Sequence, residues 1–283
     1  MRSLSQKLSR RRRSRWAGPA VLLVGLLMTG GLYAVFAPAQ AQKTESSASP
    51  DQIAKGRALF LVGCSSCHGK NGEGIMTKKG GNYGPSLVGV GAAAVDFQVG
   101  TGRMPMTQPG TQAPRKRPVY DAEETKALGA FVQSLGPGPA VPEASQYDIS
   151  SMSKEDVREG GEFFRTNCTA CHNFNGTGGA LPHGRYAPTL VGVEPRHIYE
   201  AMMTGPQQMP VFSDAVLTPE DKAKIIAYLK KNEEQPNYGG FSLGSLGPVS
   251  EGMFVWILGI GGLVLFAVWI AAHTTRSTKK VDL

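Results

Sequence analysis

The stretch "CSSCHGKNGEG", residues 64–74, places two cysteines three positions apart with a histidine directly after the second. A second stretch of the same form, "CTACHNFNGTG", occupies residues 168–178, and the two use all 4 cysteines of the chain. Two thiols and an imidazole at this spacing can bind a metal ion, form a disulfide or attach a haem. The surrounding sequence decides among these chemistries.

The flanks of the two stretches also match each other. "NYGPSLVGV" at 82–90 corresponds to "RYAPTLVGV" at 185–193, and "GRMPM" at 102–106 corresponds to "QQMPV" at 207–211. The blocks keep the same order, and their offset stays between 103 and 105 residues. Self-similarity at a fixed offset predicts two copies of one structural module.

Each module is expected to be mainly α. A helix carrying Phe60 or Phe164 leads into the cysteine motif, a Gly-rich loop follows, and a helix at 121–135 or 218–232 closes the module. The closing helices start with Asp or Thr-Pro and repeat apolar residues at helical spacing, and no alternation typical of strands is evident. The predicted divisions are a first module, a Pro/Gly linker and a second module, at residues 51–136, 137–152 and 153–235.

Two apolar runs lie outside these modules. Residues 17–37 and 252–272 are each long enough to cross a bilayer as a helix. Basic residues on their outer sides predict that the segment 1–16 and the tail 273–283 are cytoplasmic, with the modules on the extracytoplasmic side of the cell membrane. "AQA" at 39–41 resembles a signal cleavage site, so the first run is either a retained anchor or a removed signal.

The formal net charge of +8 comes from the two ends of the chain. Between residues 17 and 273 there are 20 basic and 21 acidic residues. The body therefore lacks the basic surplus of a nucleic-acid-binding protein, and we expect membrane lipid rather than nucleic acid as a partner.

The CxxCH pattern is typical of c-type haem attachment, in which two thiols form thioether bonds and the histidine binds the iron. A zinc ion held by the four cysteines would leave both histidines unexplained. A thioredoxin-like dithiol needs a βαβ setting, and a disulfide across two residues closes too small a loop to stabilise much. We therefore predict two covalently attached haem c groups. The predicted attachment and proximal residues are Cys64, Cys67, His68, Cys168, Cys171 and His172.

The second axial ligand of each iron is predicted to be a methionine. Met104 lies 36 residues after His68, Met209 lies 37 residues after His172, and a proline follows each methionine. Histidine opposite methionine gives a saturated iron at raised potential, which suits electron transfer rather than catalysis. Weaker candidates for this position are Met76 and Met106 in the first module and His183, His197, Met202 and Met203 in the second.

These motifs, with an apolar helix at each end, resemble the dihaem cytochrome c subunits of the actinobacterial menaquinol-cytochrome c reductase, the cytochrome bcc complex. The resemblance implies two tandem class I cytochrome c modules flanked by transmembrane helices. It implies a respiratory translocase complex with a cytochrome b subunit and a Rieske iron-sulfur subunit, and electron transfer from the Rieske subunit to the copper centre of a haem-copper oxidase in a supercomplex. It also implies that a loop proline, Pro85 or Pro188, orients each proximal histidine through its carbonyl group.

Two alternative functions remain open from the sequence. One is a cytochrome subunit of another membrane dehydrogenase or oxidase, and the other is a dihaem peroxidase, which would need an open iron position. We find no acid-base or nucleophile constellation apart from the predicted haem sites, so no active site of the chain's own is expected.

Overall fold

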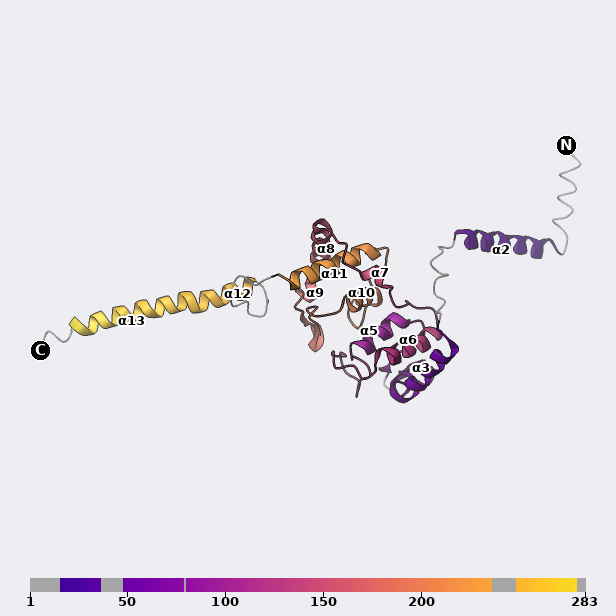
Figure 1. Cartoon of the computed structure of the whole chain (residues 1–283), viewed down its shortest axis with the longest axis horizontal. Coiled ribbons are helices and arrows are strands. Elements are labelled where there is room, and N and C mark those ends of the chain that lie inside the picture. The colour runs from indigo at the N-terminus through magenta and orange to yellow at the C-terminus, as the bar shows by residue number, and fades with distance from the viewer. Residues whose placement is uncertain (1–15, 37–47, 79, 236–247, 279–283) are drawn as a thin grey trace, which may run out of the picture. The chain divides into compact units, whose positions relative to one another are not determined.

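A computed structural model describes residues 16–36, 48–78, 80–235 and 248–278 (Figure 1). The predicted basic segment, the "AQA" stretch and the end of the predicted tail lie outside these residues. The chain divides into two compact units, Met1–Glu45 and Ser46–Leu283. The described element of the smaller unit is α2, Ala17–Phe36, a helix where an apolar one was predicted.

In the first segment, residues 51–136, two helices pack directly against each other: α3 (Pro50–Gly63) and α6 (Ala122–Ser134). The Ser49 side chain caps α3, and a reciprocal capping box between Asp121 and Glu124 starts α6. The two backbones touch at a glycine, because a Cβ atom on Gly56 would lie 1.9 Å from the carbonyl oxygen of Ala127.

The second segment, residues 153–235, pairs its helices in the same way. Here α8 (Lys154–Asn167) packs against α11 (Pro219–Glu233), and a Cβ atom on Gly160 would lie 2.0 Å from the carbonyl oxygen of Lys224. An aromatic pair lies beside each contact: Phe60 with Phe131, with ring centroids 5.0 Å apart, and Phe164 with Tyr228, 5.6 Å apart. Both segments therefore have the leading and closing helices that were expected.

The residues between these helices are more ordered than the predicted loop. The first segment contains β1 (Ile75–Met76), β2 (Asn82–Gly84) and helix α5 (Ala92–Gly100). The second contains β3 (Gly179–Leu181), η2 (Pro182–Gly184), β4 (Arg185–Ala187) and helix α10 (Pro195–Thr204). The strands form two antiparallel pairs, β1 with β2 and β3 with β4. The Gly-rich stretch directly after each motif is a loop, as expected, but the strands and the added helix beyond it were missed, because strands of two or three residues are too short to show alternation.

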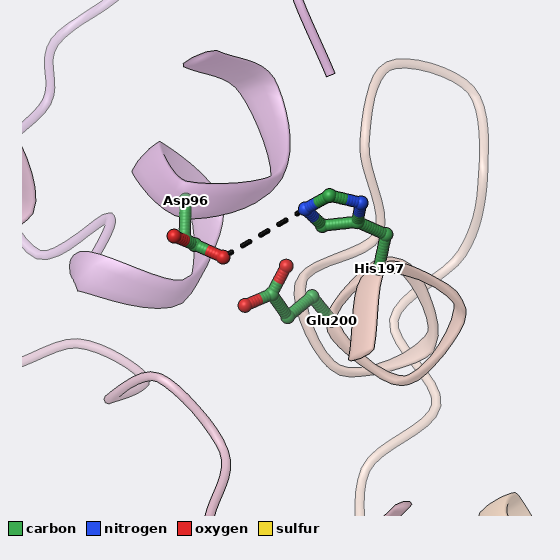
Figure 2. Close-up of side chains that lie close together, drawn as sticks. All are labelled: Asp96, His197 and Glu200. Carbon is green, nitrogen blue, oxygen red and sulfur yellow. Dashed lines mark ion pairs between the residues drawn. The ribbon is translucent and has the colours of Figure 1, made fainter. Parts of the chain in front are cut away.

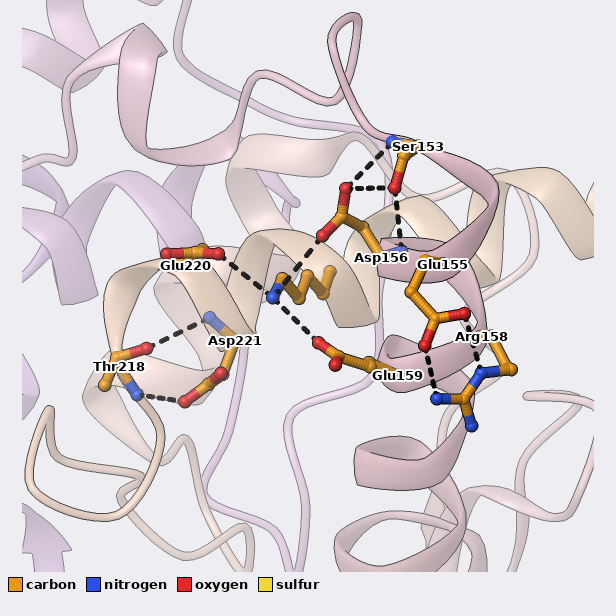
Figure 3. A network of polar contacts seen from close by, with 9 residues as sticks. Ser153, Glu155, Asp156, Arg158, Glu159, Thr218, Glu220 and Asp221 are labelled. Carbon is orange, nitrogen blue, oxygen red and sulfur yellow. Dashed lines mark hydrogen bonds and ion pairs between the residues drawn. The ribbon is translucent and has the colours of Figure 1, made fainter.

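Polar contacts reinforce the second segment (Figure 3). The Lys224 ammonium lies 2.8 Å from a Glu159 oxygen, 3.0 Å from a Glu220 oxygen and 3.4 Å from an Asp156 oxygen, which bridges α8 and α11. A second lysine, Lys222, is fully buried, and its ammonium lies 2.6 Å from Asp214 Oδ1.

The two segments contact each other through α5 and α10 and through a loop of the first segment. The Gln112 side chain donates to the carbonyl oxygen of Tyr186 at 2.6 Å and accepts from the Tyr186 amide at 2.9 Å. The Gln207 side chain exchanges a similar pair of hydrogen bonds with the backbone of Ala113, both at 3.1 Å. The loop that follows Met104 thus holds the strand and the turn on either side of α10.

The stretch 137–152, expected to be a linker, contains the short helix α7 (Ala144–Tyr147). Its first half packs on the first segment, where the Pro139 carbonyl accepts from the Ala93 amide at 3.1 Å. Its second half packs on the second segment, where Gln146 Nε2 donates to the Tyr199 hydroxyl at 3.3 Å. The connector is therefore part of both folds.

The C-terminal end is one long helical run, formed by α12 (Pro248–Val255), η4 (Trp256–Ile260) and α13 (Gly261–Thr278). Among the described residues, the helix long and apolar enough to cross a membrane is Val249–His273, and its most apolar part is wholly uncovered by protein. The apolar stretch Ala17–Gly31 within α2 is shorter.

Candidate haem sites

Each cysteine motif lies at the end of a leading helix. Cys64 ends α3 and starts α4 (Ser65–His68), and Cys168 ends α8 and starts α9 (Thr169–His172). A single helical turn therefore carries the second cysteine and the histidine of each motif. The backbone then turns back on itself, with the Gly74 amide donating to the His68 carbonyl at 2.7 Å and the Gly178 amide donating to the His172 carbonyl at 2.9 Å.

Both histidines are oriented by a proline carbonyl, as the resemblance implied. Nδ1 of His68 lies 2.7 Å from the Pro85 oxygen, and Nδ1 of His172 lies 3.0 Å from the Pro188 oxygen. Because a carbonyl oxygen only accepts, Nδ1 carries the proton in each bond, which leaves Nε2 as the nitrogen available to a metal ion. A neutral imidazole with its second nitrogen fixed in this way is the usual form of a metal-binding histidine.

The two predicted methionines occupy matching places. Met104 packs against the first segment's apolar core, as Cys64 does, and Met209 packs against the second segment's core, as Cys168 does. Both side chains are half-buried. Cysteine, histidine and methionine of each segment thus come from one small cluster of elements.

The other methionine and histidine candidates are placed differently. Met76 is exposed in β1, His183 is exposed in η2, and Met202 is buried in the second core. Met106 is half-buried, and Met203 packs against the edge of the second core. His197 lies against Asp96 of the other segment, with Nε2 3.8 Å from Oδ2.

The four thiols do not come together as one metal site among the described residues. All four cysteines are free, and burial, followed by the neighbouring thiol, raises the pKa of Cys64 to about 11 and that of Cys168 to about 12. Burial lowers the pKa of His172, against an opposing effect of its hydrogen bond to Pro188. Among the described residues the four cysteines form no common group of possible metal ligands, which argues against the shared zinc site.

Apolar side chains beside each motif are left uncovered by protein. Tyr83 and Val88 in the first segment, and Tyr186 and Val191 in the second, are all exposed. Two thiols, a histidine nitrogen, a methionine sulfur and a nearby apolar surface are the donors and surroundings that a covalently attached haem requires. The residues present therefore fit a haem in each segment.

One group of chemically active side chains was missed at the level of sequence. Asp96, His197 and Glu200 come together where α5 meets α10, although about a hundred residues separate the aspartate from the other two. No local pattern connects them. The only signals were a helix start at Pro195 and a left-handed glycine end at Gly205, which together define α10.

Comparison with protein families matches each segment to a cytochrome family. Residues 53–136 match the model described as "Cytochrome c", and residues 155–229 match "Cytochrome C oxidase, cbb3-type, subunit III". The protein is thus mainly helical with two cytochrome c domains, and such domains hold covalently bound haem c.

Whole-chain comparisons identify the family. A protein of Mycobacterium tuberculosis named "Cytochrome bc1 complex cytochrome c subunit" is 44% identical over 274 residues, covering 96% of each chain. Proteins with the same name from Corynebacterium efficiens and Corynebacterium diphtheriae are 42% and 41% identical; this chain is covered to 96% and 95%, and theirs to 95% and 99%. The chain therefore belongs to the family of cytochrome bc1 complex cytochrome c subunits.

Proposed function

We propose that this chain is the membrane-anchored dihaem electron carrier of a quinol-oxidising respiratory complex. It would receive electrons from a Rieske iron-sulfur subunit beside a cytochrome b subunit and deliver them to the copper centre of a haem-copper oxidase. The observation that carries the proposal is the pairing, in both segments, of a proline-oriented histidine with a methionine on the same core as the first cysteine.

The residue roles follow from these contacts. Cys64, Cys67, Cys168 and Cys171 would hold the two haems covalently, and the bound haem supplies one-electron oxidation and reduction. His68 and His172 would present Nε2 to the iron, because Pro85 and Pro188 occupy Nδ1. Met104 and Met209 would complete the axial ligand sets, which removes the open position that a peroxidase needs.

Two haems are expected because the segments behave as copies of one module. Gly56 and Gly160 are 104 residues apart, as are Cys64 and Cys168, and each glycine permits the same close helix contact. The Leu87 amide donates to the Gly72 carbonyl at 2.7 Å, and the corresponding bond in the second segment is also 2.7 Å. These matched contacts support a tandem arrangement of two class I cytochrome c modules.

The membrane topology is part of the proposal. Val249–His273 would anchor the chain, and α2 would be either a second span or a signal segment. Basic residues on the outer sides of both runs favour cytoplasmic termini and haem-binding segments on the extracytoplasmic side, where c-type haems are attached. One elementary test of the arrangement is the accessibility of a tag placed after Leu283.

A second candidate is a cytochrome subunit of a haem-copper oxidase, favoured by the match of residues 155–229 to the cbb3-type subunit III model. That match covers one segment only. The named relatives align over about 96% of the chain, including both cysteine motifs and the C-terminal helix. We therefore favour the reductase subunit.

The test is to isolate the full chain through a tag after Leu283 from membranes dissolved in mild detergent, with the untagged strain as control. The proposal expects co-purified b-type haem, an iron-sulfur protein and a terminal oxidase, and reduction of the c-type haems by added quinol. Recovery with an oxidase but without b-type haem or iron-sulfur protein would favour the second candidate. Recovery with a dehydrogenase would reject both.

A further inference from the structure

Where α5 meets α10, three side chains bring together buried polar atoms that have no hydrogen-bond partner (Figure 2). Asp96 comes from the first segment, and His197 and Glu200 come from one face of α10 in the second. One ligand atom of each lies within 4.8 Å of the others, and Nε2 of His197 is 3.8 Å from Oδ2 of Asp96. The three side chains point toward a common space between the helices.

Burial of these three polar side chains destabilises the fold unless their polar atoms find partners. Glu200 is 0% exposed and His197 is 7% exposed, while the side chain of Asp96 is 13% exposed. Oδ2 of Asp96, Nε2 of His197 and both carboxylate oxygens of Glu200 have no hydrogen-bond partner. Buried polar atoms normally have hydrogen-bond partners, and a buried carboxylate without one destabilises the fold.

The nearby charges do not remove this cost. The nearest cation is the Arg196 guanidinium, which lies 3.3 Å from Oδ2 of Asp96 and is partly exposed. It pairs with Asp96 and attracts Glu200 from farther away, but neither Glu200 nor Nε2 of His197 gains a hydrogen bond from it. The carboxylate of Glu194 lies 4.0 Å from Nδ1 of His197, on the solvent side of the ring. A carboxylate behind a histidine is a common arrangement in metal sites, because it favours a free Nε2.

We propose that Asp96, His197 and Glu200 bind one divalent transition-metal ion, with zinc as the best fit, between the two haem-binding segments. One imidazole nitrogen and two carboxylate oxygens form a donor set that zinc accepts, at about 2.0 to 2.2 Å from each atom. Four-coordinate geometry at that distance spaces the ligand atoms by roughly 3.4 Å, so small side-chain rotations would close the site. Calcium would require six or more oxygens, which these three residues do not supply.

The competing explanation for the stability of this buried cluster is that a proton, instead of a metal ion, neutralises its charge. Burial, followed by the charge of Asp96, raises the pKa of Glu200 to about 10, so a metal-free site would hold Glu200 protonated. A proton shared between Glu200 and Asp96 would serve the two carboxyl groups and leave Nε2 of His197 unpaired. A metal ion engages all three side chains at once.

The first test measures metal content in the full chain, purified with its haems in detergent. Zinc, manganese, cobalt, nickel and copper are determined by plasma mass spectrometry and normalised to protein. We expect about one metal ion per chain, predominantly zinc, and at least a tenfold loss in both Glu200→Gln and His197→Ala. Two exposed matched controls, Glu162→Gln and His183→Ala, should retain the metal.

The second test does not depend on the folding of a variant. Wild-type chain is treated with a chelator, and zinc is added back while thermal unfolding is followed. At a zinc concentration about 100 times the dissociation constant, mass action predicts a rise in unfolding temperature of roughly 5 °C. Asp96→Asn, which keeps the side-chain shape, should abolish this rise while retaining the haem absorption spectrum.

The proposal is wrong if wild-type chain contains no stoichiometric metal and zinc does not change its unfolding temperature. It is equally wrong if Glu200→Gln, with its haems in place, binds zinc as the wild type does. In either case an infrared band of a protonated carboxyl group, lost in Glu200→Gln, would establish the proton instead.

Discussion

The first and second segments share the contacts that position the cysteine motif and differ in the contacts farther away. A glycine at the helix crossing, an aromatic pair beside it and a proline carbonyl on the histidine occur in both. In α11 of the second segment Lys222 and Lys224 make buried or bridging ion pairs. The corresponding positions of α6, counted from the capping boxes, are Thr125 and Ala127.

This difference shows that residue choice is restricted more strongly around the cysteine motif than elsewhere in the helices. The geometry around the motif permits only a few residue types, because a backbone crossing or a carbonyl contact must be kept. The side chains at these positions need only a stable arrangement: the second segment has buried or bridging lysines there, and the first has the small buried residues Thr125 and Ala127.

The largest effect is expected at the glycine crossings. Gly56→Ala and Gly160→Ala would each place a methyl group about 2 Å from a backbone oxygen, so the helices must move apart. We expect a cost of about 3 kcal/mol or more in each segment and loss of haem from that segment alone. Haem per chain, measured as the pyridine haemochromogen, should fall from two to one.

The matched control is Gly129→Ala on α6. A Cβ atom there would meet its nearest neighbour, the Ala92 side chain, at 3.5 Å, which is ordinary contact. This variant should keep both haems. Retention of two haems in Gly56→Ala as well would show that the close crossing is not required.

The next largest loss of stability should be confined to the second segment. Asp214→Ala leaves the buried Lys222 ammonium without its carboxylate partner, and we expect a loss of about 2 kcal/mol in the free energy of unfolding. The double variant Lys222→Met, Asp214→Ala should recover most of it, because an apolar side chain needs no partner. Denaturant unfolding followed at the haem absorption band measures both. A double variant no more stable than Asp214→Ala would contradict the argument.

Replacing the methionines should affect both segments alike. Met104→Leu or Met209→Leu is expected to leave the haem attached and to lower the potential of that haem by on the order of 0.1 V, because the thioether ligand is lost. A spectroelectrochemical titration would resolve the two proposed haems. An unchanged potential would mean that another residue binds the iron, with Met106 or Met203 as the next to test.

The smallest effect is expected from the loop that joins the segments. Gln112→Ala removes two hydrogen bonds to Tyr186, which lies two residues before Pro188. A looser β4 should weaken the bond from His172 to the Pro188 carbonyl and make the imidazole less electron-rich. We expect the potential of the second haem to rise by on the order of 10 mV while that of the first is unchanged. Equal shifts in both would reject this local explanation.

Much of each haem site was accessible from sequence because its signals are local. CxxCH, Met-Pro and the capping residues Asp121 and Thr218 each act within a few positions, and the helices they predicted are present. The contacts of Pro85 and Pro188 came from the resemblance and are also present. The pairing of each methionine with its iron stays a prediction.

The contact between the two segments could not be predicted from local sequence signals. Helix α5 buries residues on alternating positions all around its axis, so its sequence lacks the one-sided apolar spacing of a surface helix. Asp96 gains its neighbours His197 and Glu200 only where the two segments meet. His197 was considered as an iron ligand, and its actual neighbour is a carboxylate from the other segment.

The stretch 137–152, whose two halves pack on different segments, affects the order in which the segments can fold. Pro139 contacts the first segment and Gln146 contacts Tyr199 of the second, so we expect the first fold to close before the second segment has been synthesised and, on the proposed topology, exported. The haem-ligation machinery would then meet the two CxxCH motifs one after the other. We expect a chain truncated after Pro142 to mature with a single haem, and one truncated after Gly136 to be degraded. The order of translation would thus keep two similar half-folded polypeptides from exchanging helices.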